Sequence, residues 1–216
     1  KFALAYFKPN MAGMSEVEAL YNKNILSVRR EFAYEDKKES FRVDLAIFLN
    51  GIPVGMIELK KQTAGQKAGF EGTNQFKHTR NPAELVFGFN KRTLVYFTLD
   101  EFEAYLTTRL DKNETKFIPF NKGTLDEGAG NPTVDGKHCT CYVWEEILRK
   151  EMLLKIIREF MFIDDEGVMI FRVIISWMRF CGWRRTSEGL ELGAVIWSGI
   201  ALVAARPRLL PGCRND

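Results

Sequence analysis

Cysteine is scarce in this sequence, and the few cysteines form no paired framework. The four are Cys139, Cys141, Cys181 and Cys213. Small disulfide-stabilised secreted domains carry closely spaced cysteine pairs, so that class is excluded and a reducing, cytoplasmic location is expected. His138 stands beside Cys139, but no second Cys/His pair exists to complete four zinc ligands. A zinc site is therefore not expected.

Long hydrophobic runs and a strong net charge are also missing. The longest apolar run, Leu192 to Ala205, is shorter than the roughly 20 residues that span a bilayer and is interrupted by Ser198, so no membrane span is expected. No signal peptide pattern is present either. The sequence has 31 Lys and Arg against 28 Asp and Glu, a charge that permits DNA binding without arguing for it. The Walker A pattern G-x-x-x-x-G-K-[ST] is absent as well.

The stretch from Phe41 to Lys61 is predicted to form a β-hairpin. Two β-rich runs, 43–49 and 53–59, flank Asn50-Gly51, the strongest short hairpin signal. Strand side chains alternate between the two faces of a sheet. One apolar face is therefore expected to hold Val43, Leu45, Ile47 and Leu49, and the other to hold Asp44, Ala46 and Phe48. On the second strand, Met56, Glu58 and Lys60 are expected to share a face.

The geometry of the turn decides whether two carboxylates meet. A strict two-residue loop would place Asp44 opposite Ile57, whereas a three-residue loop closed by a bulge would place it opposite Glu58. Pro53 cannot donate to a ladder, which favours the looser turn. Two carboxylates this close repel each other and favour a divalent cation between them. Lys60 then lies two residues along the same face.

This spacing, D-x(13)-E-x-K, is that of the PD-(D/E)xK nuclease core. The bare pattern also arises by chance, and the alternative is three solvated charges on an edge hairpin. The segment RVDLAIFLNGIPVGMIELKK, however, resembles the nuclease segment of the R (restriction and motor) subunit of type I restriction endonucleases. The resemblance continues in family order through RNPAELVFGFNKRTLVYFTLDEFEAYLTTRL, FIPFNKG, GAGNP and YVWEEIL, and covers roughly residues 21–162.

The resemblance implies an α/β fold with a restriction-endonuclease-like core, in which helices flank a central mixed β-sheet of about five strands. Alternation and apolar runs predict further strands over 25–34, 93–99 and 103–108, the first of them paired with 43–49. Helical spacing predicts an amphipathic helix over 142–162 that packs on the sheet. In the family, a helix is expected over 62–80.

The resemblance also implies roles for individual residues. Asp44 and Glu58 would bind Mg²⁺, which polarises the scissile phosphate and lowers the pKa of a bound water. Lys60 would orient that water and offset charge that develops on the phosphorane. Gln75 matches a family glutamine that helps order the active site, with an exposed helical amide as the alternative. Related nucleases often add a third carboxylate from a helix before the first core strand, and the candidates here are Glu16 and Glu18.

The tail departs from the family. The resemblance ends near Ile170, where the family continues into an ATP-driven motor. Read one nucleotide earlier, codons for 171–180 allow FPRYHQLDAV and those for 199–207 allow HSAGSGKT, a Walker A motif. We interpret 1–165 as the nuclease domain, with room for missing residues before Lys1, and 166–216 as an aberrant tail from a frameshifted motor domain. An unbroken DNA reading frame across codons 165–175, without motor sequence in the alternative frame, would contradict this.

The sequence therefore predicts a type I site-specific deoxyribonuclease fragment that hydrolyses double-stranded DNA with Mg²⁺. By resemblance, the intact enzyme cleaves after ATP-driven translocation and works with methylation and specificity subunits. An alternative from another class is a non-catalytic module that docks DNA or those subunits. A different nuclease on the same core is a third interpretation, against which PFNKG and GAGNP in family order argue.

Overall fold

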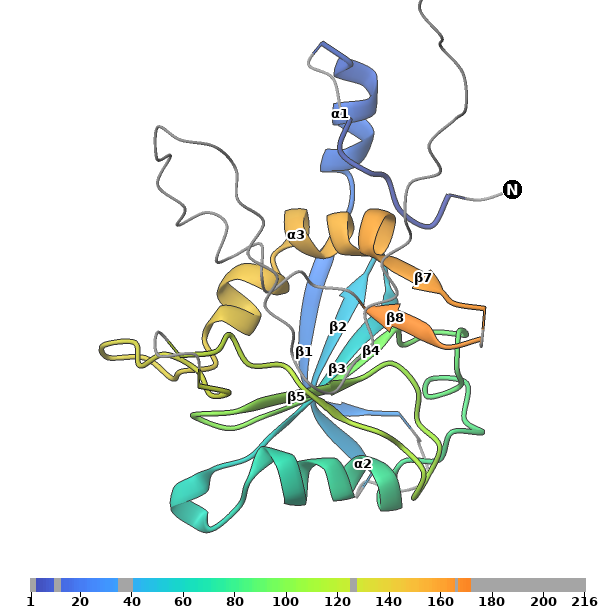
Figure 1. Cartoon of the computed structure of the whole chain (residues 1–216). Coiled ribbons are helices and arrows are strands. Elements are labelled where there is room, and N and C mark those ends of the chain that lie inside the picture. The colour runs from blue at the N-terminus through green and yellow to red at the C-terminus, as the bar shows by residue number, and fades with distance from the viewer. Residues whose placement is uncertain (1–2, 10–12, 35–40, 125–127, 166, 172–216) are drawn as a thin grey trace, which may run out of the picture.

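A six-stranded mixed sheet forms the centre of the molecule in the computed structural model, which describes residues 3–9, 13–34, 41–124, 128–165 and 167–171 (Figure 1). The strands lie in chain order, and every pair is antiparallel except β3 and β4, which are parallel. They are β1 (Leu26–Ala33), β2 (Arg42–Leu49), β3 (Ile52–Leu59), β4 (Val95–Leu99), β5 (Ala104–Thr107) and β6 (Ile118–Pro119). The predicted α/β class and mixed sheet are confirmed, with the two-residue β6 as an additional strand.

The β2–β3 hairpin has the predicted register offset, but the extra residue lies in a different place. Leu49 pairs with Ile52 across a strict two-residue turn, in which Asn50 and Gly51 have φ values of 51° and 83°. Such a pair of positive φ angles is typical of the tight hairpin turn that Asn-Gly favours. The register then shifts by one between Ile47 and Phe48. The predicted three-residue loop is therefore wrong, because the bulge lies within the strands.

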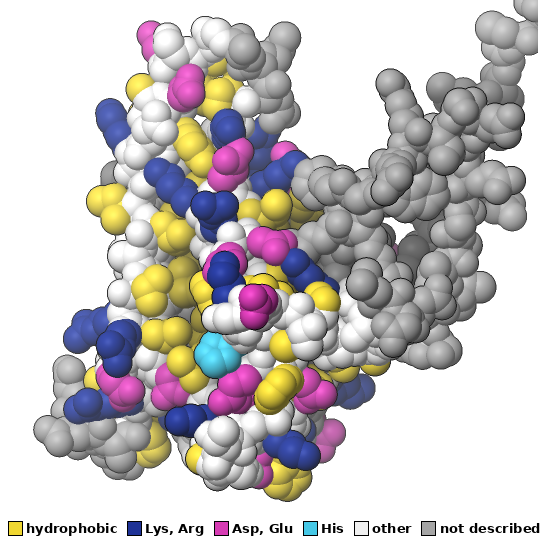
Figure 2. Space-filling model, turned by 90° about the vertical axis from the view of Figure 1, so that its left-hand side faces the viewer, with side chains coloured by type: hydrophobic (Ala, Val, Ile, Leu, Met, Phe, Trp, Pro, Cys, Tyr) yellow, Lys and Arg dark blue, Asp and Glu magenta, His cyan; other side chains and the backbone are white. Residues whose placement is uncertain are grey.

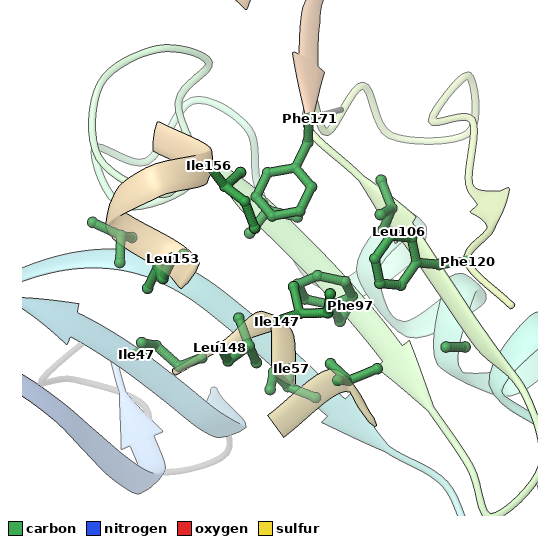
Figure 3. Packing of buried hydrophobic residues seen from close by; sticks show 14 of the residues in the cluster. Ile47, Ile57, Phe97, Leu106, Phe120, Ile147, Leu148, Leu153, Ile156 and Phe171 are labelled. Carbon is green, nitrogen blue, oxygen red and sulfur yellow. The ribbon is translucent and has the colours of Figure 1, made fainter. Parts of the chain in front are cut away.

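Two hydrophobic clusters cover the two faces of the sheet. One packs beneath the helical segments near α3 (Lys150–Lys155), and Figure 3 shows Ile147 beside Phe97 and Ile156 beside Phe171 there. The other lies against α2 (Thr73–Thr79) and is made of Val43, Met56, Phe76, Phe87, Tyr96 and Leu110. Helices on both faces leave β4 buried along its whole length, as its apolar sequence predicts.

The parallel β3–β4 pair requires a long crossover, and the crossover contains α2. After β3 the chain forms a 3₁₀ turn, η1 (Gln62–Ala64), then the π-helical turn η2 (Ala68–Gly72), which runs directly into α2. The predicted single helix over 62–80 is therefore shorter than expected. Gly65 accounts for one break, because it ends η1 with a φ of 73° that favours glycine. α2 ends at Thr79, one residue before the predicted end at 80, and Pro82 follows three residues later.

The predicted amphipathic helix over 142–162 is interrupted. It consists of the π-helical turn η3 (Val143–Ile147), α3, and a second π-helical turn η4 (Ile156–Phe160). Arg149 is extended, with a ψ of 145°, so the helix restarts there. The chain then forms the short hairpin of β7 (Met161–Ile163) and β8 (Met169–Phe171). The predicted apolar stripe nevertheless packs on the sheet, because Ile147, Leu154 and Ile156 are all buried in its core.

The PFNKG and GAGNP motifs hold the chain against β5. The Asn121 side-chain oxygen accepts from the Ala104 N–H at 3.0 Å and from the Asn131 amide at 2.9 Å. The Asn131 oxygen in turn accepts from the Lys122 N–H at 2.7 Å, and its amide nitrogen donates to the Phe102 carbonyl. The two asparagines therefore fix the loop that follows β6.

The packed region reaches β8, where Phe171 belongs to the core. Residues 172–216 of the predicted tail, which include the Leu192 to Ala205 run, lie outside the described residues, so the boundary at 165 and the frameshift stay predictions. Within the described ranges, no helix is long and apolar enough to cross a membrane. The helix α1 (Ser15–Asn22) lies beyond α3, on the opposite side of the sheet from α2 (Figure 1).

Candidate active site

Strand β3 directs Glu58 toward α2. Met56 packs in the cluster on the α2 side and Ile57 in the cluster on the α3 side, as strand alternation requires. Glu58, two residues after Met56, therefore points toward α2, where it is fully buried. Lys60 follows the end of the strand, and its backbone N–H donates to the Leu99 carbonyl at 2.8 Å. This packing confirms that Met56 and Glu58 share a face of the sheet, as predicted.

Asp44 lies at a distortion of β2. Both ladders omit it: β1 pairs with Val43 and Leu45, and pairing to β3 begins at Leu45. Glu31, which would face Asp44 across β1, has a φ of 48°. Val43 packs on the α2 side, whereas Leu45 packs on the α3 side. The prediction that Val43 shares a face with Leu45, Ile47 and Leu49 is therefore wrong, because the strand does not alternate regularly through Asp44.

The same distortion brings Asp44 to the end of β3. Continuing the Leu45–Ile57 register by one residue places Asp44 level with Glu58. One Asp44 carboxylate oxygen accepts the Leu59 backbone N–H at 2.7 Å. The half-buried Asp44 carboxylate also contributes to raising the pKa of Glu58. The structure thus brings the two predicted carboxylates together, each on its own strand.

Gln75 contacts both Glu58 and Lys60. Its amide nitrogen donates to Glu58 Oε2 at 2.8 Å, and its amide oxygen accepts from Lys60 Nζ. Gln75 lies on the first turns of α2, which reaches the sheet through η2. There the Thr98 hydroxyl, beside Glu58 in the β3–β4 ladder, donates to the Ala68 carbonyl at 3.0 Å. The alternative of Gln75 as an exposed amide does not hold in this structure.

Gly72 sets how closely α2 approaches the sheet. A Cβ atom at this position would lie 2.9 Å from Thr98 Cβ and 3.4 Å from Lys60 Cγ. We expect Gly72→Ala to lower the free energy of unfolding by roughly 1–3 kcal/mol, the usual range for overpacking. Urea unfolding followed by circular dichroism measures the loss.

Gly130→Ala is the matched control for this prediction. A Cβ atom there would meet only Thr124 Cγ2, at 3.8 Å, and should cost much less. Equal stability of Gly72→Ala and Gly130→Ala would show that α2 can move away from Thr98 without penalty.

Arg80 is a site residue that the sequence prediction missed. It follows α2 and is buried, and its NH2 group donates to Glu58 Oε1 and to the Arg42 carbonyl, the latter at 2.6 Å. Its NH1 group donates to the Tyr34 hydroxyl at 3.1 Å. The only sequence signal was a charged residue directly after the helix that carries Gln75. Glu58 is therefore in a buried ion pair, with one oxygen bound to Arg80 and the other to Gln75.

Burial dominates the ionisation of Glu58. Removal from water raises the pKa of this carboxyl from an ordinary 4.5 to about 7, although the Arg80 guanidinium acts in the opposite direction. Asp44 raises it further and Lys60 lowers it, both as smaller influences. A carboxyl in this range changes its charge near neutral pH, as acids and bases at functional sites often do.

Two other predicted candidates lie elsewhere. Glu16 and Glu18 are on α1, which is on the opposite side of the sheet from α2, so the structure does not bring them to Glu58 (Figure 1).

Cys139 and Cys141 are buried free thiols. Figure 2 shows acidic, basic and hydrophobic side chains interspersed over one face, in keeping with the small net charge of +3.

One protein family matches the segment that contains this whole site. Residues 18–115 match the family described as the type I restriction enzyme R protein N terminus. This segment belongs to that family. All five candidate site residues lie inside the match, namely Asp44, Glu58, Lys60, Gln75 and Arg80. No curated protein matches the chain.

The carboxylates of this R protein region are of the kind that binds Mg²⁺. Mg²⁺ prefers oxygen ligands and is usually held by one or two carboxylates together with water and substrate phosphates. Asp44 and Glu58 supply two such carboxylates, and the described ranges contain no group of three His, Cys, Asp or Glu side chains that could hold a metal ion. Both Glu58 oxygens already accept a hydrogen bond, one from Arg80 and the other from Gln75.

Proposed function

We propose that this R protein region is a Mg²⁺-dependent endonuclease domain that hydrolyses phosphodiester bonds of double-stranded DNA. The observation that supports it is the convergence of Asp44, Glu58, Lys60 and Gln75 beside α2. Two carboxylates with an ammonium group beside them supply what phosphodiester hydrolysis needs: a place for a divalent cation and a fixed positive charge.

Each residue has a distinct role in this proposal. Asp44 and Glu58 would hold the cation, which supplies positive charge to the phosphate and acidifies water. Lys60 offsets negative charge that develops on the phosphate in the transition state. Gln75 contacts both Lys60 and Glu58, so it fixes their relative positions before substrate binds.

The family supports a wider setting for this activity. R proteins are components of type I restriction enzymes, so we propose double-stranded DNA as substrate, methylation and specificity subunits as partners, and the cytoplasm as location. The sequence contains no Walker A motif, so ATP-driven translocation would need a motor that this sequence does not supply. We therefore expect only weak, non-specific nicking from this polypeptide.

A plasmid assay tests the proposal. With Mg²⁺ and excess protein, supercoiled plasmid should convert slowly to nicked circles, and EDTA should stop the conversion. Asp44→Asn should abolish nicking, because it removes a charged cation ligand. Asp135→Asn, at an exposed aspartate, is the matched control and should nick at the wild-type rate. Nicking that survives Asp44→Asn would contradict the proposed site.

A second candidate function is a non-catalytic module that docks DNA or partner subunits. The buried Arg80–Glu58 pair favours it, because a carboxylate held by a guanidinium is often purely structural. Calorimetry with Mn²⁺ separates the two functions. The nuclease requires cation binding that Glu58→Gln weakens strongly, whereas the docking module predicts no binding or binding that Glu58→Gln leaves unchanged.

A further inference from the structure

The three nitrogens of the Arg80 guanidinium are not equally well hydrogen-bonded. It is only 4% exposed, and its two terminal nitrogens donate to Glu58, Arg42 and Tyr34. Its Nε–H group is buried and has no hydrogen-bond partner in the part of the chain that the structure describes. Buried polar groups without partners are rare, and each calls for an explanation.

The position of Arg80 relative to the carboxylates suggests that explanation. Its NH2 group donates to Glu58 Oε1 while Gln75 donates to Oε2, so both oxygens of the carboxylate that would share a cation with Asp44 already have a partner, one of them cationic. A guanidinium and a divalent cation on one buried carboxylate repel each other strongly where water is excluded. Occupation by one therefore disfavours occupation by the other.

We propose that Arg80 is a built-in competitor of the divalent cation at Glu58. Without the cation, Arg80 neutralises the buried carboxylate and keeps the site folded. When the cation binds, Glu58 exchanges the guanidinium for it, while Arg80 keeps its contacts with the Arg42 carbonyl and the Tyr34 hydroxyl. The inference rests on the proposed function, because it takes Glu58 as a cation ligand.

The competition predicts an unusual direction of effect. Removal of a residue that positions a ligand lowers the affinity for the cation, whereas removal of a competitor raises that affinity. The apparent affinity of a site is reduced by the fraction of molecules in which the site is blocked. Removing Arg80 should therefore tighten Mn²⁺ binding by on the order of tenfold and make the cation-free protein less stable.

Calorimetry with Mn²⁺ at pH 8, without DNA, tests this with Arg80→Met, which keeps the bulk and removes the charge. Tyr34→Phe is the matched control: it removes one Arg80 contact but leaves the Arg80–Glu58 pair intact, so its affinity should stay within about twofold of wild type. Equal or weaker Mn²⁺ binding by Arg80→Met would overturn the proposal. Absence of binding by wild type and Arg80→Met alike would overturn the proposed function together with it.

A second measurement covers the case in which Arg80→Met does not fold. In the wild-type protein, the ¹⁵N-labelled Arg80 Nε–H can be followed by NMR as Mg²⁺ is added, with its signal assigned from its loss in Arg80→Lys. The proposal expects a large shift and faster hydrogen exchange when Mg²⁺ saturates the site, because the ion pair opens. An unchanged Arg80 signal at saturating Mg²⁺ would overturn it while leaving cation binding, and hence the proposed function, intact.

Discussion

Lys60→Ala is expected to lower the rate of Mg²⁺-dependent cleavage by about 10²–10³, the usual effect of removing one group that stabilises transition-state charge. Lys60 Nζ donates to Gln75, which also contacts Glu58, so the ammonium is fixed beside the carboxylates. Because Lys60 is not a cation ligand in the proposal, Mn²⁺ binding should be retained while cleavage is lost. Single-turnover cleavage of plasmid and calorimetry measure the two quantities separately.

Lys61 offers a matched control for Lys60. It is the next residue along the chain and is exposed, so Lys61→Ala removes the same charge and the same number of atoms outside the site. We expect it to change the cleavage rate by less than about twofold, since exposed charges act weakly at a distance. A rate loss shared equally by the two variants would indicate general attraction of DNA. Joint loss of cleavage and Mn²⁺ binding in Lys60→Ala would indicate a structural role.

The pH dependence of stability should report the burial of Glu58. Its pKa is raised from 4.5 to about 7 in the folded protein. Between these two values the unfolded chain has released the proton and the folded protein keeps it, so the free energy of unfolding falls as pH rises. The fall should amount to about 3 kcal/mol over the whole window and end above about pH 7. Below about pH 4.5 this contribution is fully present.

Comparison with Glu58→Gln isolates this effect from other carboxyl groups. Urea unfolding in EDTA, repeated from pH 4.5 to 8, gives the stability of each protein. The stability of wild type minus that of Glu58→Gln should decline with pH, because only the wild type carries the titrating group. A difference that rises with pH would mean that Arg80 outweighs burial and that the pKa of Glu58 lies below its ordinary value.

Local patterns predicted the hairpin and the carboxylate pair but not the details of their backbone. Asn50-Gly51 and the alternation of the flanking strands identified β2 and β3, and the required one-residue offset is present. The bulge lies within the ladder, where no turn residue marks it. The irregularity at Asp44 lies opposite the positive φ of Glu31 on the neighbouring strand, and a pattern within one strand contains no information about its neighbour.

Arg80 could not be assigned from the sequence for a related reason. Its three partners come from β1–β2 and β3, each far from it along the chain. Helical and strand periodicities describe which face of an element is buried, but not which buried charges meet across elements. Gln75 was predicted only because the family resemblance supplied it. The interruption of the helix at Arg149 was missed because the apolar spacing continues through it.

The parallel pairing of β3 with β4 has a consequence for how the protein folds. The β2–β3 hairpin is local in sequence and can form rapidly, whereas β4 joins it only after the whole stretch between Leu59 and Val95 has closed. Pairings between distant segments form slowly, because the chain loses entropy before it gains contacts. Arg80 and Gln75 both arrive with that stretch, so Glu58 remains hydrated on the early hairpin. The pairing of Glu58 with Gln75 and Arg80 is therefore a late step of folding.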